Sequence, residues 1–275
     1  MKKWQFNLLL GVFAAAFLVS GFFLARYFLQ IRQNEVTYSA LSDIVAQARQ
    51  EQSTKPTLPE GEDLEPTSPY VTVTDPETGA QVELLPEFAE LYLLNNDLVG
   101  WLTIDGTNID YPVVQDKENV DYYLYRDFYK NSSRGGCLYA KEACDVAAPT
   151  DNIVIYGHNT RGGEIMFHAL NGYTSKSFWE EHPTIRFSSL KENATYEIMA
   201  VFKTTATVDQ GFDYHLFVDA QTREEFQTFV DTCNELSFYD TGVEAAFGDK
   251  FITLSTCEYT LENGRLVVVA KRVGE

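Results

Sequence analysis

The stretch ITLSTCEYTLENGRLVVVAKR, Ile252 to Arg272, decides the fold. Two β-branched, apolar runs flank a short polar segment that contains Asn263 and Gly264, a strong hairpin signal. If the two runs pair as antiparallel strands, Arg265 lies beside Cys257. A guanidinium near a thiol favours the thiolate and can donate hydrogen bonds to an oxyanion. Taken alone, Cys257 would be a half-buried structural thiol, but the pairing with Arg265 points to cysteine acyl-transfer chemistry.

Composition narrows the class of protein. The chain has 275 residues, 45% of them hydrophobic, which is enough to bury a sizeable core. Its formal net charge of −19 argues against a nucleic-acid partner, because phosphate backbones attract clustered lysine and arginine. We interpret the acidic balance as a solvated protein surface.

The N-terminus has the length and composition of a membrane anchor. No charged residue occurs from Trp4 to Ala25, about the length that a helix needs to cross a bilayer. Lys2 and Lys3 precede this run and favour a cytoplasmic N-terminus. A cleaved signal peptide is the alternative, but the apolar run is long and no clear A-x-A site follows it. We therefore expect residues 1–27 to be an uncleaved single-pass anchor, with the rest of the chain outside the cell membrane.

Residues 28–83 are predicted to connect the anchor to the folded domain. The first part has apolar residues at helical spacing and is expected to form a stalk helix. Five of the nine prolines fall between Ser53 and Ala80 among acidic and hydroxyl residues, which is typical of an extended linker. The catalytic domain is expected to cover residues 84–275.

Within that domain, short strands predominate. Residues 86–100 are expected to form a short helix, and residues 219–236 a second helix with Asp219 as a plausible N-cap. Alternating or β-branched runs predict strands in the segments GWLTI (100–104), IDYPVVQ (109–115), DYYLYRDF (121–128), GGCLYA (135–140), NIVIYGHN (152–159) and ATYEIMAVFKTTAT (194–207). Together with the two closing strands, this pattern predicts a mainly β fold, a closed barrel with helices on its periphery.

Four cysteines are present. Cys137 and Cys144 are close enough in sequence to form a loop disulfide in an oxidising compartment, although a bridge is not the favoured reading. Cys233 falls on the apolar face of the second helix and is interpreted as a small core residue. Cys257 stands at a strand end, where scaffolded catalytic groups usually occur.

An acyl transfer by Cys257 needs a proton carrier, and four histidines are available. His182 follows two glutamates and is typical of a surface or capping residue, and His215 lies in an aromatic loop and is interpreted as structural. His168 is expected on a helix. His158 directly follows the strand NIVIYG, so its position at a strand end favours it modestly over the other three.

The motifs IYGHN (155–159), MFHALNGY (166–173) and TLSTC (253–257), with an arginine eight residues after the cysteine, resemble the sortase family. The long insertion that carries a helix before FITLSTC resembles class B in particular. The resemblance extends over nearly all of residues 84–275 and implies an eight-stranded β-barrel. One departure is Lys141 in GGCLYAKEACD, where class B chains often carry an acidic residue nearby.

The resemblance implies that Cys257 is the nucleophile, His158 the general acid and base, and Arg265 the clamp for the oxyanion and substrate. It also implies a reaction: Cys257 attacks the carbonyl of a threonine in a C-terminal sorting signal, and an amine resolves the thioacyl-enzyme. No cofactor and no metal ion are implied. We further expect substrate contacts from the strand before the nucleophile and from the residue after His158, namely Leu254, Ser255, Thr256 and Asn159.

The implied partners are surface proteins that bear the sorting signal and a cell-wall precursor that supplies the amine, as in Gram-positive surface-protein anchoring. A pilin lysine is the alternative acceptor, which would make the chain a pilus-polymerising sortase. Two other classes stay open: a non-catalytic surface barrel that binds peptide or glycan, and a different cysteine acyl-transferase. An L,D-transpeptidase would show His-Gly-Cys on one strand and a papain-like peptidase a Cys-Trp dipeptide, and neither sequence is present.

Overall fold

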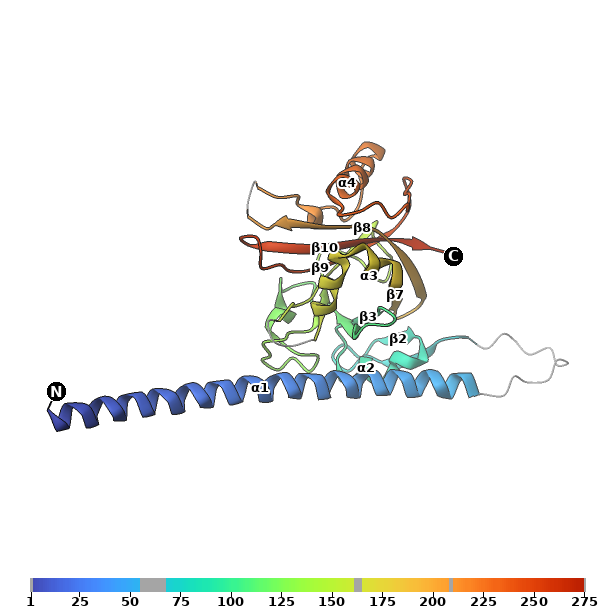
Figure 1. Ribbon diagram of the computed structural model, residues 1–275. Helices are drawn as coiled ribbons and strands as arrows, with labels where there is room; N and C mark the ends of the chain where they lie inside the picture. The colour runs from blue at the N-terminus through green and yellow to red at the C-terminus, as the bar shows by residue number, and fades with distance from the viewer. Residues whose placement is uncertain (1, 55–67, 161–164, 208–209, 275) are drawn as a thin grey trace.

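The computed structural model describes residues 2–54, 68–160, 165–207 and 210–274. At its centre is a closed barrel of eight strands in the order β10-β8-β7-β3-β4-β5-β6-β9, with helices outside it (Figure 1). The predicted closed barrel with peripheral helices is confirmed. The barrel strands are β3 (Leu98–Thr103), β4 (Asp110–Val114), β5 (Leu138–Ala140), β6 (Asn152–Tyr156), β7 (Thr184–Ser189), β8 (Asn193–Thr205), β9 (Phe251–Cys257) and β10 (Gly264–Val273).

The remaining elements surround this barrel. They are α1 (Lys3–Thr54), β1 (Val71–Thr74), β2 (Gln81–Leu84), η1 (Pro86–Phe88), α2 (Ala89–Leu94), η2 (Tyr122–Tyr125), η3 (Phe167–Thr174), α3 (Lys176–Glu181), η4 (Tyr214–Leu216) and α4 (Arg223–Leu236). Strand pairing within the barrel is antiparallel except for β4 with β5 and β6 with β9.

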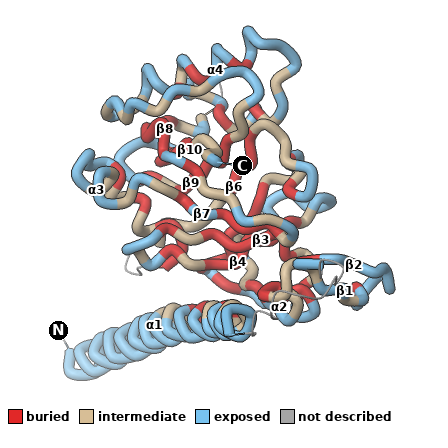
Figure 2. The backbone as a smooth tube through the Cα atoms, turned by 90° about the vertical axis from the view of Figure 1, so that its right-hand side faces the viewer, coloured by how far each residue is buried: buried red, intermediate tan, exposed pale blue. Residues whose placement is uncertain are grey.

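The closing strands of the barrel face two cores. Side chains of successive strand residues point to opposite faces, so alternate residues of β10 divide between the cores. Leu266 and Val268 belong to the barrel interior, whereas Val267 and Val269 belong to an outer cluster under α4. Burial on both faces explains why β10 is a continuous apolar run in the sequence, and Figure 2 shows the buried strands at the centre of the molecule.

Helix α4 covers the outer cluster with one apolar face, as its spacing predicted. Phe226, Phe229 and Cys233 are buried there, and the ring of Phe229 contacts that of Phe251 on β9. The expected N-cap is wrong, however. Thr222 caps the helix by accepting a hydrogen bond from a first-turn amide, while the Asp219 carboxylate accepts the amide of Asp151 at the start of β6.

The segment DYYLYRDF was expected to be a strand, but it contains the short 3-10 helix η2. Asp121 adopts a left-handed conformation with φ of 56°, which ends any extended run. Tyr123 is then buried, and its hydroxyl donates to Asp97, whereas Tyr125 is exposed. The aromatic residues that suggested a strand are thus distributed around a turn instead of across a sheet.

Helix α1 is continuous from the predicted membrane anchor onto the barrel. Its exposed N-terminal part is long and apolar enough to cross a membrane, and it projects away from the domain (Figure 1). Further along, Asn34, Tyr38, Leu41 and Val45 are buried at helical spacing, and the helix contacts η1, α2 and β4. Tyr38 donates a hydrogen bond of 2.7 Å to the carbonyl of Gly136.

Because of this docking, part of the predicted connector, residues 28–83, packs against the folded domain. The predicted boundary at Leu84 treats the helix as a stalk outside the domain, yet Tyr38, Leu41 and Val45 are part of the barrel core cluster. The sequence pattern shows which helical face is apolar but does not show whether that face has a partner within the same chain.

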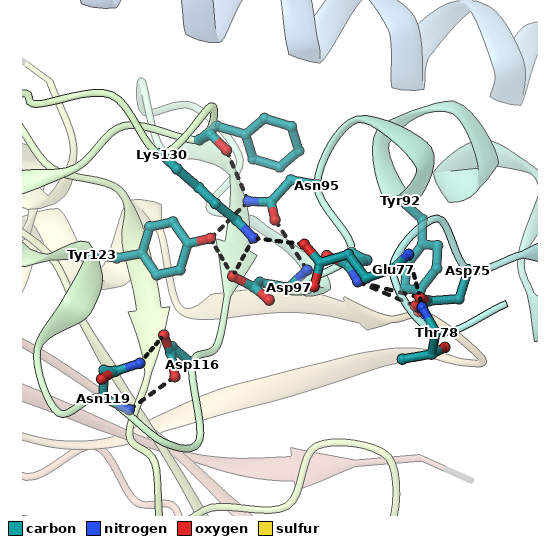
Figure 3. A network of polar contacts seen from close by, with 12 residues as sticks. Asp75, Glu77, Thr78, Tyr92, Asn95, Asp97, Asp116, Asn119, Tyr123 and Lys130 are labelled. Atoms are coloured by element: carbon teal, nitrogen blue, oxygen red, sulfur yellow. Dashed lines mark hydrogen bonds and ion pairs between the residues drawn. The ribbon is translucent and has the colours of Figure 1, made fainter. Parts of the chain in front are cut away.

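The β1–β2 hairpin lies in the predicted linker, where no strand was expected. Asp75 caps its turn by accepting the amides of Glu77 and Thr78, and the hydroxyl of Tyr92 donates to the same carboxylate at 2.6 Å. Lys130 bridges Glu77 of the hairpin to Asp97, in the polar network of Figure 3. The most proline-rich part of the predicted linker, residues 55–67, lies outside the described residues.

All four cysteines are free. The thiol of Cys137 contacts the carbonyl of Pro112 in the barrel core, and that of Cys144 contacts the carbonyl of Asn152 in the outer cluster. The possible Cys137–Cys144 bridge is therefore not formed. Cys233 is a fully buried core residue, as interpreted from the sequence.

Candidate active site

One pocket of about 340 Å³ contains all three residues expected to carry the chemistry, His158, Cys257 and Arg265. It lies at the end of the barrel where β6 and β9 terminate and β10 begins. Three further segments complete its wall: η2 with the residues before it, the segment after β5, and the loop from β8 to η4. The parallel pairing of β6 with β9 explains how residues 99 positions apart come to one site, since the two strands end together.

Cys257 and Arg265 are directly paired across the antiparallel β9–β10 ladder, as the hairpin pattern predicted. Cys257 is half-buried at the last position of its strand. The guanidinium Nη1 of Arg265 donates to the carbonyls of Asn263 and Gly264 at 3.2 and 2.9 Å. These bonds hold Nη1 in place. A guanidinium has five N–H donors in all, so the donors on its other nitrogens are not used by these two bonds.

Glu258, directly after the nucleophile candidate, holds the turn that brings Arg265 back to Cys257. Its carboxylate accepts the amides of Thr260 and Leu261 at 2.9 and 3.0 Å and forms an ion pair of 2.8 Å with Lys203 on β8. Burial by itself raises the pKa of Glu258, but the hydrogen bonds from Lys203 and Thr260 lower it to about 2. The carboxylate is thus charged at neutral pH and can hold the turn.

His158 follows β6 by two residues and is half-buried beside Tyr125, with the ring centroids 5.5 Å apart. Its Nε2 lies 2.7 Å from the carbonyl oxygen of Leu124. A carbonyl oxygen can only accept, so Nε2 carries the proton and Nδ1 is the basic nitrogen of the neutral ring. Burial lowers the pKa of His158, against a smaller raising effect of the bond to Leu124.

Asn159 was expected to contact substrate, but its side chain is hydrogen-bonded to the backbone of Cys257 at the end of β9. It is buried and does not line the pocket. Its amide Nδ2 donates to the carbonyl of Cys257 at 3.0 Å, and its Oδ1 accepts from Nδ1 of His168 at 3.0 Å. His168 belongs to the MFHALNGY motif and lies in the 3-10 helix η3. The motif is therefore connected to the backbone of Cys257 by hydrogen bonds through Asn159.

The three residues before Cys257 differ in their access to the pocket. Thr256 and Ser255 line it but are almost fully buried, and their hydroxyls are bonded to the carbonyl of Gly157 and to the hydroxyl of Tyr214, both at 2.6 Å. Leu254 is fully buried in the barrel core, so its side chain has no access to a substrate.

The pocket also contains residues that sequence reasoning did not assign to it. His215 lines the pocket, although its aromatic loop suggested a structural role. Lys141 and Glu142 form an ion pair of 3.1 Å in the same wall. Burial lowers the pKa of His215, and the positive charge of Lys141 adds to this effect. The unusual basic residue at position 141 was the only signal of this wall in the sequence.

The remaining histidine is distant from this chemistry. Nδ1 of His182 donates a hydrogen bond of 2.8 Å to the carbonyl of Asp105, in the turn between β3 and β4. Within the described residues, no group of three or more His, Cys, Asp or Glu side chains is arranged to hold a metal ion.

Comparison with known proteins identifies the family. Residues 102–273 match the family model of the sortase domain. The chain belongs to the sortase family, class B. Sortase B of Listeria monocytogenes is 35% identical over 198 residues, which cover 71% of this chain and 78% of the relative. Sortase B of Staphylococcus aureus is 33% identical over 193 residues, covering 70% and 76%.

The fold agrees with this assignment. A structure of a Staphylococcus aureus sortase B–substrate complex superposes with a TM-score of 0.71 at 26% identity, covering 89% of this chain and 98% of that one. As a sortase, the chain is a cysteine transpeptidase that acts on proteins with a sorting signal and on amine acceptors. The apolar part of α1 is consistent with a single-pass membrane anchor.

Proposed function

We propose that this sortase cleaves a C-terminal sorting signal after threonine through a thioacyl-enzyme on Cys257 and transfers the protein to an amine of a cell-wall precursor. The observation that carries the proposal is the meeting of Cys257, His158 and Arg265 in one pocket at the end of the barrel. Each brings the chemistry that one step of acyl transfer needs.

In the first half-reaction, the sulfur of Cys257 attacks the carbonyl carbon of the threonine. Arg265 lies across the ladder from Cys257, where its N–H groups can stabilise the oxyanion that forms. His158, kept neutral by burial, takes the thiol proton and then gives it to the amine of the leaving peptide. The C–N bond breaks, and a thioester to Cys257 remains.

In the second half-reaction, an acceptor amine attacks the thioester. His158 removes the proton from the amine nitrogen, and the thiolate of Cys257 leaves as the new amide forms. The open pocket admits the acceptor after the cleaved peptide departs. Lys141, Glu142 and His215 give the pocket a polar wall that either ligand can contact.

The site is proposed to act at the outer face of the cell membrane. Lys2 and Lys3 precede the apolar run of α1 and favour a cytoplasmic N-terminus, which leaves the barrel outside. Both substrates are available on that side, since surface proteins are exported and wall precursors are presented there.

Mass spectrometry of the products formed with a sorting-peptide library tests the proposal directly. The active protein should yield a cleaved peptide joined to the added amine, and Cys257→Ala should yield neither product nor thioester. A wall-type amine and a peptide lysine offered together decide between wall anchoring and pilus polymerisation. Cleavage that persists in Cys257→Ala would exclude the proposed mechanism.

A further inference from the structure

The direction of α1 relative to the barrel determines which end of the barrel faces the membrane. The helix runs without a break from its apolar part to the docked residues, and the sequence has no glycine or proline between Tyr27 and Thr54. Sharp kinks in helices occur almost always at such residues or at local irregularities of the hydrogen-bond ladder. Because Asn34, Tyr38, Leu41 and Val45 are buried against the domain, α1 holds the barrel in one orientation.

The pocket opens at the end of the barrel nearer the membrane. Figure 1 shows the β9–β10 turn and the C-terminal end of β8 on the side of the barrel that faces the N-terminal end of α1. The first buried residue of α1, Asn34, is seven positions after Tyr27, where the predicted anchor ends. At 1.5 Å per residue this is a rise of only about 10 Å. The mouth of the pocket is therefore held close to the surface of the bilayer.

The loops around this mouth expose large apolar side chains. Val120, before η2, and Leu216, in η4, are each 67% exposed; Val120 lines the pocket itself, and Leu216 directly follows the lining residue His215. Tyr125 packs against His158 and is 60% exposed, and the β9–β10 turn adds Tyr259 and Leu261. We call these five residues the mouth rim. They come from three separate segments of the chain, each of which also contributes residues to the pocket or directly follows one that does.

We propose that the mouth rim contacts the interface of the bilayer into which α1 inserts, so that the active site works against the membrane surface. Tyrosine beside aliphatic residues is the composition that membrane interfaces favour. The net charge of −19 means that attraction to anionic lipids does not supply this contact, so apolar insertion must carry it. The proposal rests on the membrane insertion of α1 and is independent of the reaction.

Such a contact would place the pocket where membrane-linked substrates arrive. A sorting signal still attached to an apolar segment, and an acceptor amine on a lipid carrier, are both confined to within a short distance of the bilayer. A pocket that faced away from the membrane would require each of them to extend around the barrel.

The test measures how close the rim lies to lipid in the full chain. Leu261→Cys is introduced into a Cys257→Ala background, labelled with a fluorophore, and reconstituted into phosphatidylcholine vesicles that carry spin-labelled headgroups. The matched control is Phe247→Cys in the same background. Phe247 is 43% exposed against 45% for Leu261, but it precedes β9 and so lies at the opposite end of that strand. The three native cysteines that remain are buried and should not react.

The expected result is a several-fold loss of fluorescence at position 261 and no loss at position 247. Equal quenching at both positions, or none at position 261, would overturn the proposal. Quenching at 261 that appears only after an apolar peptide is added would also overturn it, because the rim would then bind substrate instead of lipid. Turnover of a soluble sorting peptide by Leu261→Gln, which should be unchanged, separates failure of this proposal from failure of the proposed function.

Discussion

Replacing Leu41 by alanine tests whether the docked part of α1 belongs to the folded domain. Leu41 is completely buried in the barrel core cluster, on a helix that contacts η1, α2 and β4. Truncating a buried leucine to alanine removes its transfer free energy and leaves a cavity, at a cost of about 2–5 kcal/mol. For a domain of this size, 1 kcal/mol lowers the melting temperature by about 2–4 °C. A loss of about 3 kcal/mol therefore predicts a fall of about 9 °C.

The assay is thermal unfolding of a chain shortened to residues 28–275, which lacks the apolar part of α1. Val36→Ala is the matched control, because Val36 lies on the same helix but is 63% exposed. Its melting temperature should stay within about 2 °C of the parent, as expected for a surface substitution. Both variants truncate an aliphatic side chain to alanine on the same helix, and the change in helix propensity is only a few tenths of a kcal/mol, so a large difference between them reports burial.

The loss at Leu41 has an upper limit, because the helix can detach while the barrel stays folded. A chain that begins at Thr54 measures this limit, since it lacks the docked residues Tyr38, Leu41 and Val45 altogether. We expect this shorter chain to be less stable than Leu41→Ala and to expose the apolar surface that the helix covers. If Leu41→Ala and Val36→Ala melt at the same temperature, the helix does not contribute to the domain core, and the boundary predicted at Leu84 is adequate.

The other predictions concern the pocket. Cys257→Ala should lose all turnover of sorting peptide yet keep the melting temperature of the parent within about 2 °C, because a half-buried thiol at a strand end contributes little packing; turnover above background would contradict this. His158→Ala should lose nearly all turnover. His168→Ala should retain a measurable rate, because His168 affects Cys257 only through its hydrogen bond to Asn159. Equal losses in the two variants would mean that His158 is not the proton carrier. Arg265→Lys should lose about 100- to 1000-fold in turnover, the effect of removing one oxyanion donor, while a small alkylating reagent still modifies Cys257 at close to the parent rate; near-normal transpeptidation would reduce Arg265 to an electrostatic neighbour. Burial lowers the pKa of His158 in the folded chain. As pH falls through about 6.5, the unfolded chain therefore binds more protons at this residue than the folded chain does, and the free energy of unfolding decreases. Urea titrations at about pH 7.5 and about pH 5 should show a larger loss for the parent than for His158→Gln, and equal losses would refute the assignment of this effect to His158.

The sequence by itself determined the β9–β10 hairpin and the candidate chemistry of its ends. The two strands are joined by residues 258–263, and Asn263 at the end of this loop adopts a positive φ of 50°. Gly264 has no positive φ and is the first residue of β10, so the Asn-Gly pair marks the return of the chain but does not form a two-residue turn. The pairing of Cys257 with Arg265 was predicted from this local pattern, whereas the loop between them is also held by Glu258, which is paired with Lys203 on β8. The apolar length of the N-terminal run and the helical face of α4 are likewise local properties, readable from spacing alone.

Tertiary structure decided which distant segments share the pocket. The parallel pairing of β6 with β9 brings His158 to Cys257, and no local pattern specifies which strands become neighbours across a barrel. For the same reason, Asn159 could not be recognised as a support of the Cys257 carbonyl, nor His215 as a pocket residue. The docking of α1 was hidden because an apolar helical face looks the same whether it meets a membrane, another chain or the barrel of its own domain. Only the fold supplies the partner surface that distinguishes these outcomes.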